Sequence, residues 1–235
     1  MSLKNLNATI KIPKQYKKKL TNLRIKKIYI NFEKNLDIKE NFAVAVSGGP
    51  DSLALAFLSK IYSLNNKLVS KFLIVDHRLR PESTKEAKLV KKVLKKHSIN
   101  AEILTWYGKK PKKNIQSFAR NKRYDLLTKR CKKFKINNII LGHHQDDLLE
   151  NFFIRIFRGS GLKGLISLER KNRVSDMNFF RPLLYQKKED LVFLSNKIFD
   201  FYVKDPTNKD EKFLRIKIRK LIEDFEKINI DKKKF

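Results

Sequence analysis

The chain has 235 residues, 41% of them hydrophobic, which is enough for one well-cored domain and a smaller appendage. Its 55 Lys and Arg residues against 24 Asp and Glu residues give a net charge of +31, and its single cysteine, Cys131, excludes an internal disulfide and a cysteine-built zinc or iron–sulfur site. Such a charge attracts polyanions, so nucleic acid is the expected partner, with a lysine-biased composition on solvated helix faces as the alternative.

The sequence lacks the features of export and of membrane insertion. Its N-terminus has basic residues without the apolar segment of a signal peptide, and no stretch approaches the roughly 18 apolar residues of a membrane span. We therefore expect a soluble, cytoplasmic protein with no membrane partner.

Residues 1–40 are rich in Lys and Asn and predict a basic extension, irregular at first and then helical. From Phe42 onward, apolar runs alternate with longer segments of helical periodicity. Strands are predicted at 42–46, 72–75, 101–105 and 138–141, and helices from residue 53 and at 84–97, 115–134 and 146–157. This alternation predicts an α/β fold, a doubly wound parallel sheet of about five strands with helices on both faces, with the ligand site at the carboxyl ends of the strands.

The alternation stops after Arg158, where a glycine-rich segment begins a turn-rich connector. Two helices are predicted in the tail, at 191–201 and 213–225, separated by the turn Asp205-Pro206-Thr207-Asn208. We therefore expect four parts: a basic extension at 1–40, a core domain at 41–160, a connector at 161–185 and a helical C-terminal region at 186–235.

The hexapeptide Ser47-Gly48-Gly49-Pro50-Asp51-Ser52 lies where the first strand gives way to a helix. Its glycines let backbone N–H groups approach an anion, and the helix N-terminus adds a partial positive charge, so the segment predicts a phosphate-binding loop. No lysine follows the glycines as in a Walker loop, which disfavours γ-phosphate transfer. A Ser-Gly-Gly turn in which Ser52 caps the helix is the purely structural alternative.

This hexapeptide resembles the PP-loop of the ATP pyrophosphatase superfamily, whose members split ATP between its α and β phosphates. The resemblance implies an adenine nucleotide hydrolase-like fold and makes 41–160 a PP-loop ATP-binding catalytic domain. It also implies that the loop after the second strand, which begins with Asp76 and His77, lines the nucleotide pocket. For that loop, a solvated turn in which Ser83 caps the next helix is the alternative.

The segment 141–155 carries acids at helical spacing. Asp147 and Glu150 lie three residues apart and share one face, while Asp146 and Asp147 are near the positive helix N-terminus. Such carboxylates could bind magnesium or grip a cationic amine. His143 and Asp147 superficially suggest zinc, but no third ligand of clear geometry accompanies them, and magnesium with ATP is simpler. A helix capped and solubilised by acids is the alternative.

Five segments in order resemble the tRNA(isoleucine)-lysidine synthetase family, over about residues 42–222. They are the PP-loop, Gly-His-x-x-Asp-Asp-x-x-Glu-Asn at 142–151, Arg-Gly-Ser-Gly-Leu-x-Gly-Leu at 158–165, Arg-Pro-Leu-Leu at 181–184 and Asp-Pro-Thr-Asn at 205–208. The resemblance implies a two-step reaction. ATP adenylates the ring carbonyl of the wobble cytidine in a CAU-anticodon isoleucine tRNA, and the side-chain amine of free lysine then displaces AMP.

The resemblance also implies site residues. The catalytic candidates are Asp51, Arg120, Arg123, His143, Asp146, Asp147 and Glu150. Among them Asp147 and Glu150 are expected to bind the lysine ammonium, and Asp51 and Asp147 to hold magnesium. The candidates for tRNA contact are Arg158, Lys163, Arg181, Arg215 and Arg219. The expected cofactor is ATP with magnesium, the expected partners are tRNA and free L-lysine, and the chain could act as a monomer or a homodimer.

The sequence departs from the family in two places. Ile216 stands in Arg215-Ile216-Lys217-Ile218-Arg219 where the family usually has Asn, which puts the fine tRNA contacts in doubt. Many members also continue into further C-terminal domains that grip the tRNA acceptor end. The dense positive charge could replace part of that grip, because phosphate contacts add affinity without reading sequence.

Three other classes fit parts of the sequence. A tRNA-thiolating PP-loop enzyme would share the ATP site but normally needs more cysteines than Cys131. A PP-loop synthetase of the amidotransferase type would have no need of a charge of +31. A non-catalytic RNA-binding protein on the same fold would not need both an intact loop and intact carboxylates.

Overall fold

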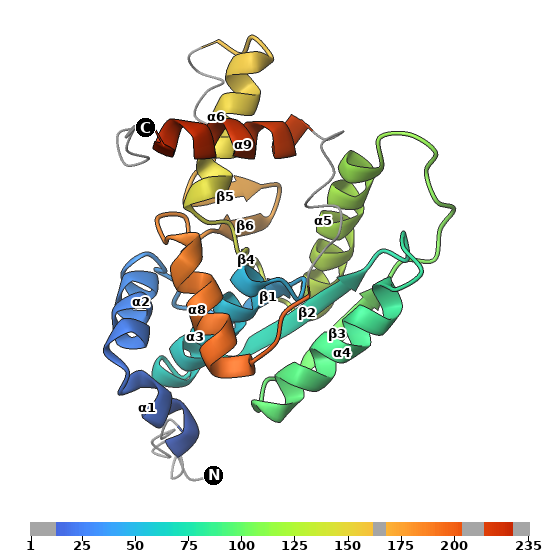
Figure 1. Cartoon of the computed structure of the whole chain (residues 1–235). Helices are drawn as coiled ribbons and strands as arrows, with labels where there is room; N and C mark the ends of the chain where they lie inside the picture. Colours follow the sequence, from blue (N-terminus) through green and yellow to red (C-terminus); the bar gives the residue numbers. More distant parts are fainter. Residues whose placement is uncertain (1–12, 162–167, 204–213, 228–235) are drawn as a thin grey trace.

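The computed structural model describes residues 13–161, 168–203 and 214–227 (Figure 1). Its centre is a six-stranded sheet of order β3-β2-β1-β4-β6-β5. The strands are β1 Phe42–Val46, β2 Ser70–Asp76, β3 Ala101–Thr105, β4 Asn138–Ile140, β5 Lys171–Val174 and β6 Met177–Phe180. All neighbours pair in parallel except β5 and β6. The predicted α/β fold with a mostly parallel sheet is therefore confirmed.

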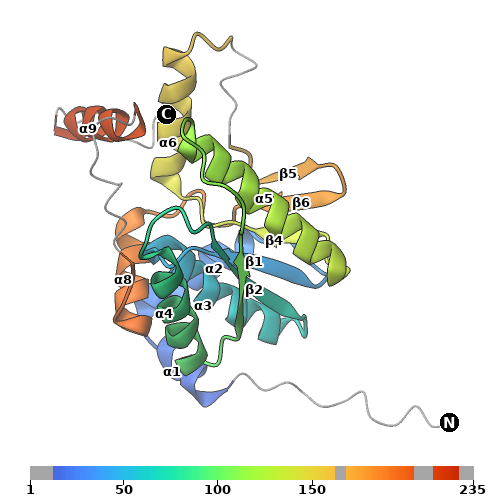
Figure 2. The same ribbon diagram turned by 90° about the vertical axis from the view of Figure 1, so that its right-hand side faces the viewer.

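Helices cover both faces of this sheet (Figure 2). They are α1 Lys14–Leu20, α2 Leu23–Lys34, α3 Pro50–Asn65, α4 Ser83–Lys96, α5 Ile115–Lys133, α6 Gln145–Phe157, α8 Lys188–Phe199 and α9 Leu214–Lys227. Alternate residues of β1 face opposite ways: Val44 joins the larger core with α2, α3, α4 and α8, while Ala43 joins a smaller core with α5. None of the described helices is both long and apolar enough to cross a bilayer.

The N-terminal part contributes to the larger core. The helix predicted within residues 1–40 is α2, and the short helix α1 precedes it; the predicted irregular start at 1–12 lies outside the described residues. Tyr16 of α1 and Phe32 of α2 are buried in the same cluster as the apolar residues of α3. Residues 13–40 therefore pack as part of the α/β body.

The connector contains structure that its sequence does not suggest. Its described part, 168–185, includes the hairpin β5–β6, and β6 extends the parallel sheet beside β4, so the sheet has six strands where we expected about five. Met177 and Phe179 are buried against β4 and α5. The two residues between the strands include Ser175 at φ 53°, where a hairpin turn usually has Asn or Gly. The hairpin therefore depends on burial against the sheet, which the local sequence does not show.

Candidate functional site

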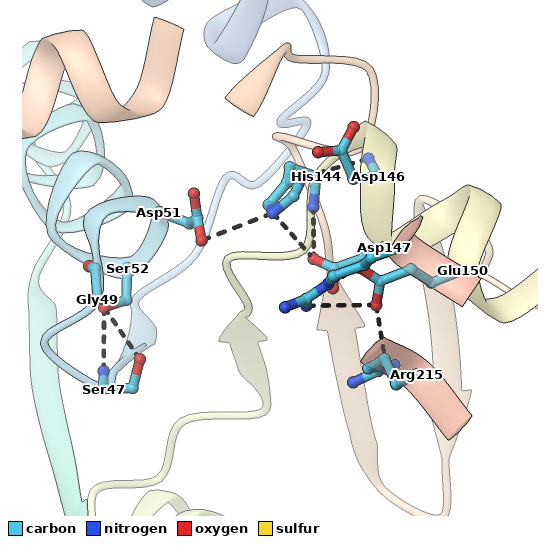
Figure 3. Close-up of polar contacts among 10 residues, drawn as sticks. Ser47, Gly49, Asp51, Ser52, His144, Asp146, Asp147, Glu150 and Arg215 are labelled. Atoms are coloured by element: carbon cyan, nitrogen blue, oxygen red, sulfur yellow. Dashed lines mark hydrogen bonds and ion pairs between the residues drawn. The ribbon is translucent and has the colours of Figure 1, made fainter. Parts of the chain in front are cut away.

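The loop at residues 47–52 is held by one hydroxyl group (Figure 3). Ser52 Oγ accepts hydrogen bonds from the backbone N–H groups of Ser47 and Gly48, at 3.1 and 3.0 Å, and donates to the carbonyl of Gly49 at 2.9 Å. Gly49 is the N-cap residue of α3, with Pro50 at the first helical position. Pro50 has no N–H, and the N–H groups of Asp51 and Ser52 have no intrahelical acceptor, which is the arrangement that binds anions at helix N-termini.

Gly48 shows why this loop requires glycine. Its φ of +90° is one that L-residues rarely adopt, and an added Cβ would lie 2.5 Å from Val90 Cγ2 of α4 and 3.0 Å from Val203 Cγ2. The carbonyl of Gly48 also accepts the backbone N–H of Val203 at 2.9 Å. The loop is therefore packed from behind by α4 and by the segment after α8.

Three side chains connect the loop to the acidic helix α6. Asp51 lies in the first turn of α3, and its Oδ2 is 3.6 Å from His144 Nε2; Asp147 Oδ2 lies 3.6 Å from the same nitrogen (Figure 3). His144 is the N-cap of α6. Its ring Nδ1 accepts the backbone N–H of Asp146 at 3.2 Å, and the backbone N–H of His144 donates to Asp147 Oδ2 at 3.1 Å. Because Nδ1 is an acceptor, the neutral ring carries its proton on Nε2, between the two carboxylates.

The two carboxylates differ in their protonation equilibria. Burial raises the pKa of Asp51 above its usual value, and the interaction with His144 only partly opposes this increase. Burial also raises the pKa of Asp147, but His144, His143, the backbone N–H of His144 and Arg215 outweigh it, so the net pKa lies below the usual value. Asp147 is therefore the carboxylate that the site holds most firmly as an anion.

Glu150, one turn further along α6, is engaged by the C-terminal helix α9. It is 1% exposed; Arg215 Nε lies 3.0 Å from its Oε2, and Arg219 Nε hydrogen-bonds its Oε1. Burial raises the pKa of Glu150 above its usual value, and the hydrogen bond and charge of Arg219 oppose this increase only in part. Two guanidinium groups on one carboxylate favour its ionised form. Both oxygens of Glu150 are thus taken by residues that we had expected to contact tRNA.

The family model of the ATP-binding PP-loop domain matches residues 17–225. The chain belongs to the PP-loop domain family. It is 40% identical over 201 residues to the tRNA(Ile)-lysidine synthase of Orientia tsutsugamushi, covering 83% of this chain and 45% of that protein. The tRNA(Ile)-lysidine synthase of Rhodopseudomonas palustris is 36% identical over 76% of this chain and 52% of its own length. The chain thus spans about half the length of the curated relatives it matches.

A solved structure with the same fold is the U34-tRNA thiolase of Methanococcus maripaludis. It superposes with a TM-score of 0.75 at 20% sequence identity, over 89% of this chain and 75% of that one. At this identity the likeness establishes the fold of this PP-loop protein and nothing about its reaction.

The second-strand loop is organised by its own residues. Both carboxylate oxygens of Asp76 are occupied, Oδ1 by the N–H of Arg78 and the hydroxyl of Ser83, at 2.9 Å each, and Oδ2 by the hydroxyl of Thr84 at 2.7 Å. Ser83 therefore secures Asp76, and the N-cap of α4 is Glu82 rather than Ser83. Asp76 shapes the loop in this structure, where we had expected it to face ATP.

His77, in contrast to Asp76, has polar side-chain atoms that are not satisfied within the loop. Both of its ring nitrogens are buried without a hydrogen-bond partner among the described residues. Burial lowers its pKa to about 4, and the charge of Arg123 contributes to this decrease. His77 is therefore neutral at physiological pH, and Arg123 on α5 lies close enough to affect its ring.

The remaining site candidates differ in their exposure to solvent. Arg120 is exposed beside the ring of Tyr124, at 5.2 Å from its centroid, and its charge lowers the pKa of His143. Arg158 ends α6 and is exposed. Arg181, expected at tRNA, is buried behind His143, while Lys163 and the turn at 205–208 lie outside the described residues.

His144 is the functional candidate that the sequence analysis passed over. Its signal was the pair His143-His144 directly before the acidic helix, which is a position where a side-chain acceptor caps the helix. Histidine is an uncommon N-cap residue, so the pattern alone did not suggest it.

A magnesium ion fits the donor chemistry of this site only in part. Asp51 Oδ1 is a buried oxygen with no partner among the described residues, which suits a hard cation or a hydrogen-bond donor. No group of three His, Cys, Asp or Glu side chains that could hold a metal occurs within residues 13–161, 168–203 and 214–227. Any metal would therefore need oxygens from the nucleotide and from water, as magnesium with ATP does.

Proposed function

We propose that this PP-loop protein converts the wobble cytidine of a CAU-anticodon isoleucine tRNA to lysidine. One observation supports the proposal above the others. The anion-binding start of α3 and the anionic start of α6 face each other across His144, so a site for ATP phosphates adjoins a site for a cationic amine. Both relatives described above carry the name of this activity.

The reaction divides into two steps between these sites. The ring carbonyl oxygen of the cytidine attacks the α-phosphorus of ATP, and pyrophosphate leaves. The free amine of lysine then attacks the adenylated carbon, and AMP leaves with the carbonyl oxygen. The N–H groups at the start of α3 stabilise the phosphate oxygens, and Arg120 and Arg123 add positive charge on the α5 side. Asp51 would help to hold a magnesium ion, which would neutralise part of the phosphate charge.

The structure leads us to divide the lysine role between two acids. Asp147 has a pKa below its usual value and faces the loop. Its anionic carboxylate therefore binds the side-chain ammonium of lysine and orients this group, which attacks as the free amine. Glu150 contacts lysine only in competition with Arg215 and Arg219, whose guanidinium groups already offset its charge. Asp146, the next acid in the first turn of α6, adds negative charge to the same helix end.

The tRNA contacts follow from the same geometry. Arg158 is exposed at the end of α6, and Arg215 and Arg219 are partly exposed beside Glu150, so all three can contact RNA phosphates near the site. The reaction requires ATP, lysine and tRNA together, so we infer a cytoplasmic location. A homodimer stays a prediction.

The thiolating alternative finds little support in the residues. Sulfur transfer needs an accessible thiolate, whereas Cys131 is fully buried on α5 in the smaller core. Burial raises the pKa of this thiol to about 12, so it stays protonated at neutral pH.

The test is an assay of pyrophosphate release with radiolabelled lysine and a CAU-anticodon isoleucine tRNA transcript. A transcript with another wobble base is the substrate control. Asp51→Asn should abolish release, and Asp37→Asn, which changes an exposed aspartate outside the site, should not. Lysine incorporated only into the CAU transcript would establish the function. Pyrophosphate release without incorporation would redirect the search to another acceptor, and the absence of both would favour an RNA-binding role.

A further inference from the structure

Arg181 connects the β5–β6 hairpin to the active site. It follows β6 directly and is 5% exposed. Its Nη1 donates to the carbonyl of Glu169 at 2.9 Å and to Asn172 Oδ1 at 2.7 Å, and its Nε donates to His143 Nδ1 at 3.2 Å. The hairpin thus holds the guanidinium in one orientation, and the guanidinium in turn holds the imidazole.

This contact determines which nitrogen of His143 carries the proton. An arginine side chain has only donors, so Nδ1 must contribute its lone pair to the hydrogen bond. A neutral imidazole with a free lone pair on Nδ1 carries its hydrogen on Nε2. No hydrogen bond to His143 Nε2 is present among the described residues. His143 therefore offers an N–H group to the site, and its only lone pair is already used.

The surroundings of His143 indicate what this N–H meets. The positive charges of Arg181, Arg120 and Arg215 all act on the ring, and together with burial they lower its pKa to about 4, although Asp147 opposes them. The ring is consequently neutral at physiological pH. A neutral donor surrounded by guanidinium groups is suited to an anionic oxygen, and the phosphate of the nucleotide is the anion that the neighbouring PP-loop would bring.

We propose that Arg181 is a positioning residue that presents His143 as a hydrogen-bond donor, through Nε2–H, to an oxygen of the α-phosphate. This assignment rests on the proposed function for its substrate. It excludes His143 as the general base for the lysine amine, because the ring has no lone pair to accept a proton while Arg181 occupies Nδ1.

The tautomer is tested without substrate, by nitrogen-15 NMR of the histidine side chains. The chain has four histidines, so single substitutions assign the signals. We expect His143 to be neutral with its proton on Nε2 at pH 7, and Arg181→Lys to remove that preference because an ammonium lacks the fixed planar donor. Arg173→Lys, on an exposed arginine of the same hairpin, should leave the spectrum unchanged. A proton on Nδ1 in the unaltered protein would overturn the proposal.

The donor role is tested by turnover. Glutamine can place an amide N–H near the Nε2 position, so His143→Gln should keep kcat within about tenfold, whereas His143→Ala should lose about a hundredfold, as for loss of one oxyanion donor. Arg181→Lys should lower kcat with little change in the KM for ATP. Equal losses in the glutamine and alanine variants would refute the donor role. If lysidine is not the product, the NMR result still decides the tautomer, so the two failures are distinguishable.

Discussion

The loop at 47–52 and the α6–α9 contact form two sides of one site, but they are held by different kinds of interaction (Figure 3). The side-chain hydrogen bonds that shape the loop join residues at most five positions apart, and one backbone hydrogen bond links Gly48 to the distant Val203. The ion pairs at Glu150 join residues separated by up to 69 positions, and the apolar contacts beside them form a small cluster apart from the two main cores. The loop side is therefore fixed by local chemistry and core packing, and the α9 side by two salt bridges and a few apolar residues.

This difference implies that the two sides respond differently to substitution. A change in the loop acts on the larger core and should alter global stability. A change at Glu150 should act on α9 alone, because local opening follows the elements with the fewest buried contacts.

Gly48→Ala should have the largest effect on stability. The new Cβ would combine an unfavourable φ with a 2.5 Å approach to Val90 Cγ2, and we expect a loss of about 3 kcal/mol in the free energy of unfolding. Gly161→Ala is the matched control, since nothing lies within 4 Å of the position its Cβ would take. Urea denaturation compares the two variants. A loss below about 1 kcal/mol in the free energy of unfolding for Gly48→Ala would show that α4 can shift away from the new Cβ at little cost.

Glu150→Gln should loosen α9 while the rest of the fold stays intact. The change removes the charge that strengthens the hydrogen bond from Arg219, worth about 1.5–3 kcal/mol, and that forms the ion pair with Arg215, although the arginines are partly exposed and solvent reduces the effect. We expect about 2 kcal/mol, measured as a roughly thirtyfold faster hydrogen exchange of α9 amides. Glu223→Gln, on an exposed glutamate of the same helix, is the control. Uniform acceleration across the sheet would contradict the separation of the two sides.

Ser52→Ala should weaken the loop by about 1–2 kcal/mol, because the backbone N–H groups of Ser47 and Gly48 would lose their acceptor. Pyrophosphate release should fall with it. Ser59 lies on the same helix and is fully buried, but its hydroxyl has no partner among the described residues. Ser59→Ala should therefore be neutral or slightly stabilising. If the two variants lose the same stability, the hydroxyl of Ser52 does not organise the loop.

His144 links the two sides, and two substitutions separate its roles. Asparagine can accept the N–H of Asp146 and so keep the cap, but it cannot reach the carboxylates of Asp51 and Asp147. Glutamine can reach these carboxylates but does not keep the cap. We expect His144→Asn to keep the melting temperature within a few degrees and to raise the KM for lysine several-fold. His144→Gln should lower the melting temperature and keep the KM. The opposite pattern would show that capping alone explains this residue.

The stability of the protein towards acid should depend on His77. Its pKa in the folded protein is about 4 against an ordinary value of 6.5, so between these values the unfolded chain binds the proton first. The free energy of unfolding should therefore fall as the pH decreases from about 6.5 to about 4. Above about pH 6.5, the contribution of His77 to the free energy of unfolding should have its full value and should not change with pH. His77→Asn should reduce the slope of the free energy of unfolding against pH in this window, by the amount that corresponds to at most one bound proton. Denaturation at several pH values measures this slope. An unchanged slope would place His77 in contact with solvent.

The regular parts of this molecule were accessible from the sequence. Phe42–Val46 has the bounds that its apolar run predicts, because buried parallel strands need continuous apolar residues between turn signals. Ala101–Thr105 also has its predicted bounds, although it includes Glu102 and is only partly buried. Asp51 and Asp147 were expected at one edge of the sheet, and the structure brings them to the two sides of His144. The β5–β6 hairpin was missed because its strands have four residues each and no typical hairpin turn.

The sequence by itself determined the α/β alternation, the phosphate loop and the acidic helix, because each depends on residues within a few positions of one another. Only the tertiary structure decided which groups these residues meet. It placed Arg215 and Arg219 on Glu150, Arg181 behind His143, and the oxygens of Asp76 on the hydroxyls of α4. Such pairings depend on how distant elements pack, and spacing along the chain contains no direct record of a contact between residues that far apart.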